Sequence, residues 1–213
     1  MEFIDDEIRQ YAESHSSAEP ELLKKINRET NVNYLFPRML SGHYQGRLLS
    51  IFSSMIRPSS ILEIGTYNGY GTICLAEGLR ADGIIYTVEI NIELEEVIRR
   101  NFQEAGITDR VSLYIGNALD VIPGMGSGFD LVYLDADKIN YITYFEMLVD
   151  RISPGGYIFA DNVLWSGKVI NNSDKDKEAY KLQEFNNYIQ ADERVENILL
   201  PVRDGIMIIR KKG

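Results

Sequence analysis

The fold is decided by one stretch, which reads Ile61-Leu62-Glu63-Ile64-Gly65-Thr66-Tyr67-Asn68-Gly69-Tyr70-Gly71. Its first four residues form a short β-rich run, three glycines follow at short intervals, and a helical segment is expected at 70–80. Glycines at such a point let the backbone turn sharply and let a ligand approach the main chain closely. The stretch therefore predicts a strand that passes through a glycine-rich turn into a helix.

The alternation of strand and helix continues from this stretch to about residue 160. Strands are expected at 61–64, 84–88, 111–115, 130–134 and 157–160, with helices between them at 70–80, 92–105, 117–122 and 140–152. Strands that alternate with helices predict βαβ units and a mostly parallel sheet that is covered on both faces. We therefore expect an α/β fold.

The segments on either side of this alternation have a different pattern. Helices are expected before it at 3–13, 20–30 and 37–56, and a loop at 166–176 and a helix ending near residue 190 are expected after it. The runs Val195–Leu200 and Ile206–Ile209 flank Asp204-Gly205, which is a hairpin signal. We predict a single domain over residues 1–213, with a helical extension at 1–57 and an α/β core at 58–213.

The composition is that of a globular protein with an acidic surplus. The 213 residues include 32 acidic and 22 basic side chains, which gives a net charge of −10. One cysteine and two histidines exclude an intrachain disulfide framework and a zinc site built from several cysteines or three histidines. The overall basic footprint of a nucleic-acid-binding protein is missing. The acidic start and the lack of a ~18-residue apolar run predict a cytoplasmic protein that does not enter a membrane.

Two acidic residues indicate a cofactor site at the glycine-rich turn. Glu63, Gly65 and Gly69 form the E-x-G-x-x-x-G pattern of S-adenosylmethionine methyltransferases, which differs from the G-x-G-x-x-G spacing of dinucleotide folds. That cofactor has no pyrophosphate, so it needs carboxylates for its amine and ribose. Glu89 ends the next strand, where a carboxylate can accept both ribose hydroxyls. The alternatives are a plain turn at Gly65 and a helix cap at Glu89.

Carboxylate and carboxamide groups follow the fourth and fifth expected strands. Asp135 follows one of them, and Asp161 and Asn162 follow the other. If these strands are neighbours, their backbones lie ~4.8 Å apart and the three side chains can converge on one cation. Oxygen ligands select Mg²⁺, Mn²⁺ or Ca²⁺ over softer metals. The alternative is that Asp135 or Asp137 caps the following helix while Asp161 and Asn162 form a turn.

With these motifs, the chain resembles the cation-dependent O-methyltransferases typified by the caffeoyl-CoA and catechol O-methyltransferases, especially their bacterial members. The resemblance covers the chain after about residue 35. It also rests on Met39, Gln45-Gly46, Gly116-Asn117-Ala118, Asp161 to Val169, Phe185-Asn186, Asp192 to Val195, Leu200-Pro201 and Asp204-Gly205. It implies a Rossmann-like class I methyltransferase fold with a seven-stranded, mostly parallel sheet, a C-terminal antiparallel hairpin, helices on both faces and N-terminal helices. It also implies a homodimer.

The resemblance implies roles for individual residues. It makes Asp135, Asp161 and Asn162 the metal ligands, with Mg²⁺ the expected ion, and Lys138 the catalytic base. The residues that it places against S-adenosylmethionine are Met39, Glu63, Gly65, Tyr67, Gly69, Gly71, Glu89, Gly116, Ala118, Asp135 and Asp137. Gly71 stands where relatives often have serine, so that contact would be made by the backbone or by Thr72.

The expected acceptor is a small aromatic compound of the catechol or hydroxycinnamoyl type. Trp165 and Tyr141 are candidate walls for its ring and His43 is a candidate contact, with ordinary core packing or a helix start as the alternatives. The stretch Ser41-Gly42-His43-Tyr44 replaces a more acidic stretch common in relatives, which leaves the acceptor wall undetermined.

Three other functions compete with this reading. The first is O-methylation of a hydroxylated wobble uridine in transfer RNA, which the net charge of −10 disfavours mildly. The second is a cofactor-binding module without activity, which the presence of Asp135, Lys138, Asp161 and Asn162 disfavours. The third is a nicotinamide-dependent dehydrogenase, which the glycine spacing disfavours.

Overall fold

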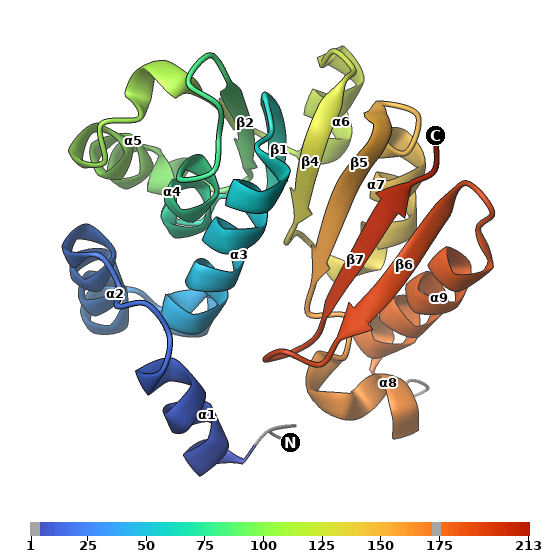
Figure 1. Cartoon of the computed structure of the whole chain (residues 1–213), viewed down its shortest axis with the longest axis horizontal. Coiled ribbons are helices and arrows are strands. Elements are labelled where there is room, and N and C mark those ends of the chain that lie inside the picture. Colours follow the sequence, from blue (N-terminus) through green and yellow to red (C-terminus); the bar gives the residue numbers. More distant parts are fainter. Residues whose placement is uncertain (1–4, 172–175) are drawn as a thin grey trace.

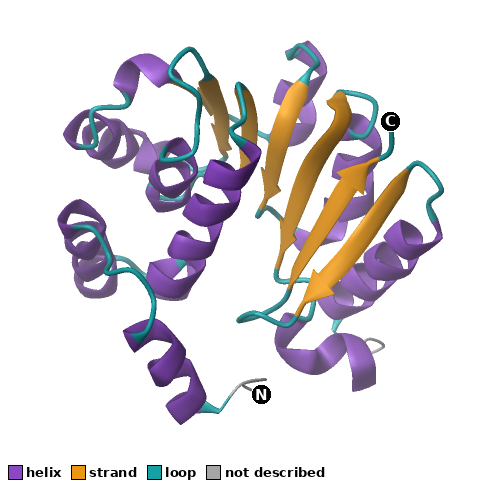
Figure 2. Ribbon diagram, viewed as in Figure 1, coloured by secondary structure: helices purple, strands orange, loops and turns teal. Residues whose placement is uncertain are grey.

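The computed structural model describes residues 5–171 and 176–213, and these residues form a central sheet with helices on both faces (Figures 1 and 2). The strands are β1 (Ser60–Ile64), β2 (Ile84–Glu89), β3 (Val111–Ile115), β4 (Phe129–Leu134), β5 (Ile152–Asp161), β6 (Val195–Leu200) and β7 (Ile206–Lys211). Their order in the seven-stranded sheet is β3-β2-β1-β4-β5-β7-β6. The strands β1 to β5 pair in parallel, whereas β7 is antiparallel to both β5 and β6. The predicted sheet and hairpin are confirmed.

The helices form one layer on each face of the sheet. The α-helices are α1 (Asp6–Ser14), α2 (Glu21–Asn33), α3 (Gly42–Ile56), α4 (Tyr70–Ala76), α5 (Glu95–Glu104), α6 (Ala118–Val121), α7 (Tyr141–Leu148), α8 (Lys168–Asn171) and α9 (Lys177–Ala191). The 3₁₀ turns are η1 (Pro37–Met39), η2 (Ile92–Leu94), η3 (Thr108–Arg110), η4 (Ile122–Gly124), η5 (Lys138–Asn140) and η6 (Trp165–Gly167). In Figure 1, α3, α4 and α5 lie in front of the sheet and α6, α7 and α9 lie behind it.

Each layer of helices encloses its own hydrophobic core. In one core, side chains such as Leu49 and Phe102 pack the helices α2, α3, α4 and α5 against the sheet. In the other core, side chains such as Phe145 and Phe185 pack α6, α7 and α9 against the opposite face. Full burial of one such side chain contributes about 1.5–3 kcal/mol. Strands that are covered on both faces read as almost continuous apolar runs, which is why their positions were predictable.

Several predicted elements differ from the structure. The helix expected at 37–56 is divided into η1 and α3, because Leu40 is extended and Gly42 has a φ of +73°. The helix expected at 140–152 ends at Leu148, because Ile152 already pairs with Phe129 as the start of β5. The helix expected at 70–80 ends at Ala76.

The prediction of a loop over residues 166–176 was wrong in part. Residues Lys168–Asn171 form the short helix α8 there. The residues 172–175 of that loop, and residues 3 and 4 of the first expected helix, lie outside the described residues.

The order of the strands reverses between β1 and β4, which makes the carboxyl end of these two strands the expected place for a ligand. Gly65, which follows β1, has a φ of +103°, and a Cβ atom there would lie 2.0 Å from the backbone oxygen of Asp135, which follows β4. Only glycine therefore allows the two strand ends to approach so closely. Among the described residues, no helix is both long and apolar enough to cross a membrane.

Candidate active site

A cavity of about 1020 Å³ opens at the carboxyl ends of the central strands. The predicted site residues that line it are Met39, Glu63, Gly65, Tyr67, Gly71, Glu89, Gly116, Ala118, Asp135, Asp137, Lys138, Asp161 and Asn162. Gly69 is not among the lining residues and instead begins α4 with a φ of +86°. The structure thus brings nearly all the predicted residues to one cavity, while their individual roles stay predictions.

Glu63 places a buried carboxylate at the floor of this cavity. Its Oε2 accepts hydrogen bonds from the Thr72 hydroxyl and from the Thr87 hydroxyl, the latter at 2.6 Å. Its Oε1 has no hydrogen-bond partner among the described residues. A Cβ atom on Gly71 would lie 2.7 Å from this Oε1, so glycine leaves room beside the unpaired oxygen. A buried acceptor without a partner is costly, and a ligand that donates to it would remove that cost.

These contacts also indicate whether the backbone at Gly71 or the Thr72 side chain would make the cofactor contact that serine is expected to make in relatives. The Thr72 side chain is fully buried, and its hydroxyl is already donated to Glu63. Of the two options left by the sequence, contact through the backbone is therefore the one that the geometry favours.

Burial raises the pKa of the Glu63 carboxyl to about 8, although the hydrogen bonds from Thr72 and Thr87 oppose the increase. An unfolded glutamate has a pKa near ~4.3, so the stabilisation linked to this proton is complete below that pH and is lost as the pH rises through 8. The Glu63→Gln variant mimics the protonated form and is expected to have a higher Tm than the wild type at pH 9, with little difference at pH 5.

This prediction is tested by thermal unfolding of the ligand-free protein across pH 5 to 9. The exposed Glu93 provides a matched control, and Glu93→Gln should follow the wild-type curve. Parallel curves for wild type and Glu63→Gln would contradict the assignment of a protonated Glu63.

Glu89 holds the end of β2 against the glycine-rich turn. Its Oε2 accepts the Tyr67 N–H at 2.7 Å, and its Oε1 accepts the Asn91 N–H at 2.8 Å. Burial raises its pKa, and these backbone hydrogen bonds limit the increase. The cap alternative for Glu89 is wrong, because Asn91 is the N-cap of η2 and its own side chain accepts the Glu93 N–H. Each carboxylate oxygen has two lone pairs, however, so the Glu89 side chain keeps acceptor capacity for a ligand in the cavity.

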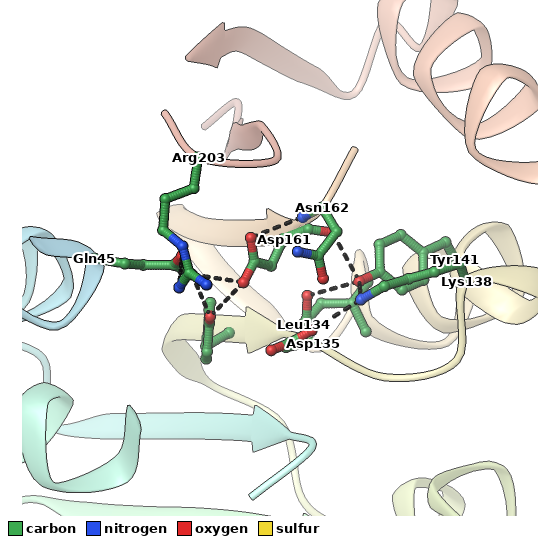
Figure 3. A network of polar contacts seen from close by, with 9 residues as sticks. Gln45, Leu134, Asp135, Lys138, Tyr141, Asp161, Asn162 and Arg203 are labelled. Atoms are coloured by element: carbon green, nitrogen blue, oxygen red, sulfur yellow. Dashed lines mark hydrogen bonds and ion pairs between the residues drawn. The ribbon is translucent and has the colours of Figure 1, made fainter. Parts of the chain in front are cut away.

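Asp135 and Asp161 lie at adjacent strand ends, as expected for neighbouring strands. β4 and β5 are paired with Leu134 opposite Ala160, so the next residue of each strand carries the carboxylate. Figure 3 shows Asp135, Asp161 and Asn162 grouped together. Burial and the nearby charge of Asp135 both raise the pKa of Asp161. A buried acid whose ionisation is disfavoured by burial and by a neighbouring carboxylate indicates a place where a cation is favourable.

Lys138 is a buried cation beside this acidic pair. Its Nζ donates to Asp135 Oδ1 at 2.8 Å and to the Tyr141 hydroxyl oxygen at 2.7 Å (Figure 3). The Tyr141 hydroxyl in turn donates to the backbone oxygens of Leu134 and Asp161. Lys138 is therefore held in a defined position on the cavity wall.

The capping alternative is wrong for Asp137. Asp137 precedes η5, yet its side chain makes no cap hydrogen bond to that turn. Its oxygens accept instead from the Asn140 amide at 2.5 Å and from the Tyr144 hydroxyl at 2.6 Å. The turn at Asp161 does form, because Asn162 has a φ of +58° and its oxygen accepts the Trp165 N–H. The turn and the convergence on Asp135 are thus compatible.

The donor set fits a hard divalent cation. Asp135, Asp161 and Asn162 offer only oxygen atoms and carry two negative charges against the one positive charge of Lys138. Asp161 Oδ1 accepts a single hydrogen bond, from the Asn162 N–H at 2.7 Å, and so retains a lone pair. The described residues contain no group of three or more histidine, cysteine, aspartate and glutamate side chains that could hold a metal ion. Any cation here would rely on the Asn162 amide as well as the two acids.

The three candidate acceptor contacts occupy different environments. Trp165 lines the cavity. Tyr141 is fully buried and supports Lys138 from behind, so it is not a wall of the cavity. The ring Nε2 of His43 lies 2.8 Å from the Ser17 backbone oxygen, and His43 does not line the cavity.

Three polar residues at the site were not given a role from the sequence. Tyr133 and Gln45 both donate to Asp161 Oδ2, and Arg203 donates to Gln45 Oε1. Tyr133 lies within an apolar strand, where its alternation with Val132 and Leu134 looks like core packing. Gln45 and Arg203 come from segments far from Asp161 in sequence, and no local spacing connects them.

Comparison with known proteins gives one consistent result. Residues 13–212 match the model of a family described as O-methyltransferase. The caffeoyl-CoA O-methyltransferase of Petroselinum crispum is 33% identical over 205 residues, which cover 91% of this chain and 85% of that protein. The caffeoyl-CoA O-methyltransferase 1 of Eucalyptus globulus is 32% identical over 204 residues, with 91% and 82% covered.

Solved structures agree over nearly the whole chain. The SAH-bound methyltransferase of Podospora anserina has a TM-score of 0.90 at 29% identity, with 98% of this chain and 95% of that chain covered. The O-methyltransferase of Bacillus cereus in complex with SAH has a TM-score of 0.86 at 30% identity, with 97% of each chain covered.

Proposed function

Since the chain belongs to the O-methyltransferase family, we propose that it methylates one hydroxyl of a small catechol-like or hydroxycinnamoyl-type aromatic acceptor. The proposed methyl donor is S-adenosylmethionine, and the proposed cation is Mg²⁺, with Mn²⁺ or Ca²⁺ as other oxygen-preferring ions. The observation that carries the proposal is the group formed by Asp135, Asp161 and Lys138 at the adjoining ends of β4 and β5.

The cofactor side of the cavity is supported by its two acidic residues. The unpaired oxygen of Glu63 would accept from the amine of the cofactor once that positive charge favours the ionised carboxylate, and Glu89 offers acceptor capacity for the ribose hydroxyls. When bound, the cofactor supplies an electrophilic methyl group on sulfur. Among similar solved structures, the methyltransferase of Podospora anserina and the O-methyltransferase of Bacillus cereus are bound to SAH, and TomG of Streptomyces achromogenes is in complex with SAM.

The acceptor side uses the acidic pair and the lysine. Asp135, Asp161 and Asn162 would hold a divalent cation, which would supply Lewis acidity that favours an ionised hydroxyl. Lys138 lies on the same wall, where its Nζ could take up the hydroxyl proton as a neutral amine, a form that a divalent cation held beside it would favour. Asp135 and Tyr141 fix that nitrogen in place, and Trp165 offers a flat apolar surface for an aromatic ring. Much of the acceleration then comes from positioning.

The acceptor class is tested by transfer of a labelled methyl group to matched pairs of compounds. Each pair consists of a vicinal aromatic diol and its analogue with a single hydroxyl, assayed with Mg²⁺. We expect kcat/KM for the diol to be at least ~100-fold higher, because in the proposed binding mode the cation would hold both vicinal oxygens. Equal turnover of both members would contradict the proposed binding mode.

Transfer RNA forms a second arm of the same experiment. Transfer RNA with and without a hydroxylated wobble uridine is offered at several salt concentrations, since binding to a phosphate backbone weakens steeply with salt. We expect no labelled RNA. Salt-sensitive methylation of the hydroxylated RNA, without turnover of any diol, would replace the proposed acceptor by the RNA.

A further inference from the structure

Arg203 has an unusual backbone conformation beside the cavity. It lies in the turn between β6 and β7, lines the cavity, and has a φ of +49°. This left-handed region disfavours every residue that has a Cβ atom, and glycine adopts it without strain. An arginine at such a position indicates that its side chain makes contacts which offset the strain.

The contacts of Arg203 all lead to the segment at the start of α3. Its guanidinium donates to the Leu40 backbone oxygen at 3.3 Å, to the Ser41 backbone oxygen, and to Gln45 Oε1 at 2.8 Å. Leu40 and Ser41 line the same cavity. Among the described residues, Arg203 has no carboxylate within ion-pair distance, so its partners are neutral oxygens of the cavity wall. Arg203 therefore ties the β6–β7 turn to the N-terminal wall of the cavity.

Gln45 links Arg203 to Asp161 by hydrogen bonds. The Gln45 side chain is buried, with a relative exposure of 1%. Because its Oε1 accepts from Arg203, its amide nitrogen faces the other way and donates to Asp161 Oδ2 at 2.5 Å and to the Tyr133 hydroxyl oxygen at 2.9 Å. Figure 3 shows the side chains of Arg203, Gln45 and Asp161 close to one another. Arg203 on one side and Asp161 on the other thus require the same orientation of the Gln45 amide.

We propose that Arg203 and Gln45 are positioning residues that orient the Asp161 carboxylate and hold residues 40–41 in the wall of the cavity. This inference deepens the proposed function and rests on it. The donors on Oδ2 leave Oδ1 as the oxygen of Asp161 that carries a single hydrogen bond and can turn to a cation. The link from Arg203 to Leu40 and Ser41 means that the same side chain also holds this part of the cavity wall in position.

The first test is hydrogen exchange in the metal-free and cofactor-free protein. Arg203→Gly removes the guanidinium and also relieves the left-handed backbone, so a Tm close to that of the wild type is expected. Arg57→Gly is the matched control, because Arg57 is also an exposed arginine with a positive φ, of 53°, and does not line this cavity. We expect faster exchange in peptides covering residues 38–45 for Arg203→Gly and wild-type exchange for Arg57→Gly.

The second test measures binding of Mn²⁺ by its electron paramagnetic resonance signal. Loss of a supporting partner of a metal ligand typically costs 10- to 100-fold in affinity, so Arg203→Gly and Gln45→Leu should each raise the Kd for Mn²⁺ at least ~10-fold. The double variant should weaken Mn²⁺ binding little more than the worse single variant, because both act through one connection. KM for the acceptor should rise in Arg203→Gly, while the Kd for S-adenosylhomocysteine stays at the wild-type value.

The outcomes separate this inference from the proposed function. Wild-type exchange at residues 38–45 together with a wild-type Kd for Mn²⁺ in Arg203→Gly would overturn the inference. The inference would also be overturned if the effects of Arg203→Gly and Gln45→Leu on the binding free energy of Mn²⁺ were fully additive. Full additivity would mean that Arg203 does not act on Asp161 by way of Gln45. A wild-type protein that binds no Mn²⁺ would contradict the proposed cation site, and the exchange measurement would still decide whether Arg203 holds the wall.

Discussion

Replacing Asp135 with alanine is expected to lower kcat/KM for methyl transfer at least ~10³-fold, the effect of losing about 4 kcal/mol of transition-state stabilisation. Two causes combine in this loss. Asp135 is one of the two proposed carboxylate ligands, and its Oδ1 is also the acidic partner of Lys138 at 2.8 Å. The substitution therefore removes a ligand and releases the proposed base. Binding of S-adenosylmethionine, measured by calorimetry, should persist.

Removal of the cation by a chelator should cause the same loss of activity as Asp135→Ala. Excess EDTA should reduce turnover by the wild-type enzyme to the level of Asp135→Ala, and added Mg²⁺ should restore it. EDTA should have little effect on Asp135→Ala itself. Asp150 is exposed beyond the end of α7, so Asp150→Ala is a control with the same loss of charge that should keep wild-type activity. Full wild-type activity in EDTA would refute the proposed cation.

Replacing Lys138 with methionine is expected to lower kcat by about 10²–10⁴-fold, the usual contribution of a positioned acid or base. Methionine matches the length of the buried stem, so the variant loses the ammonium group with little change in packing. Lys138 has a relative exposure of 8%, and its Nζ is held by Asp135 and Tyr141. Single-turnover rates with saturating cofactor and acceptor measure the effect on the chemical step.

The comparison variants for Lys138 separate chemistry from binding. Lys177 is exposed at the start of α9, and Lys177→Met should retain wild-type kcat. Mn²⁺ binding by Lys138→Met should not weaken, because the change removes a positive charge from beside the acidic pair. A wild-type single-turnover rate in Lys138→Met would exclude Lys138 as the base.

The sheet and much of the cavity were predictable because both depend on local patterns. Buried parallel strands appear in the sequence as short apolar runs, and the carboxyl ends of such strands meet along one edge of the sheet. Glu63, Glu89, Asp135 and Asp161 all stand at the ends of these runs. Pairing of β4 with β5 was the one non-local assumption that the proposed metal site required, and the register of Leu134 with Ala160 satisfies it.

The parts that sequence reasoning missed depend on contacts between distant segments. The start of β5 at Ile152 is fixed by its pairing with Phe129, although the run that follows it contains proline and two glycines. The amide of Gln45 is fixed between Asp161 and Arg203, and Arg203 is 158 residues away in sequence. Neither the backbone conformation of Arg203 nor its partners leave a spacing that can be read along the chain. Local patterns therefore located the site, whereas its supporting contacts required the tertiary structure.

The position of β7 between β5 and β6 has a consequence for how the protein forms during synthesis. β7 follows β6 in the chain, yet it supplies the pairing partner of both β5 and β6. A nascent chain that has emerged only through β6 therefore exposes the bare edge of β5, which is the kind of surface that favours aggregation. The turn that carries Arg203 reaches Gln45 only when the hairpin docks. The wall of the cavity at Arg203 is therefore complete only after β7 has paired with β5.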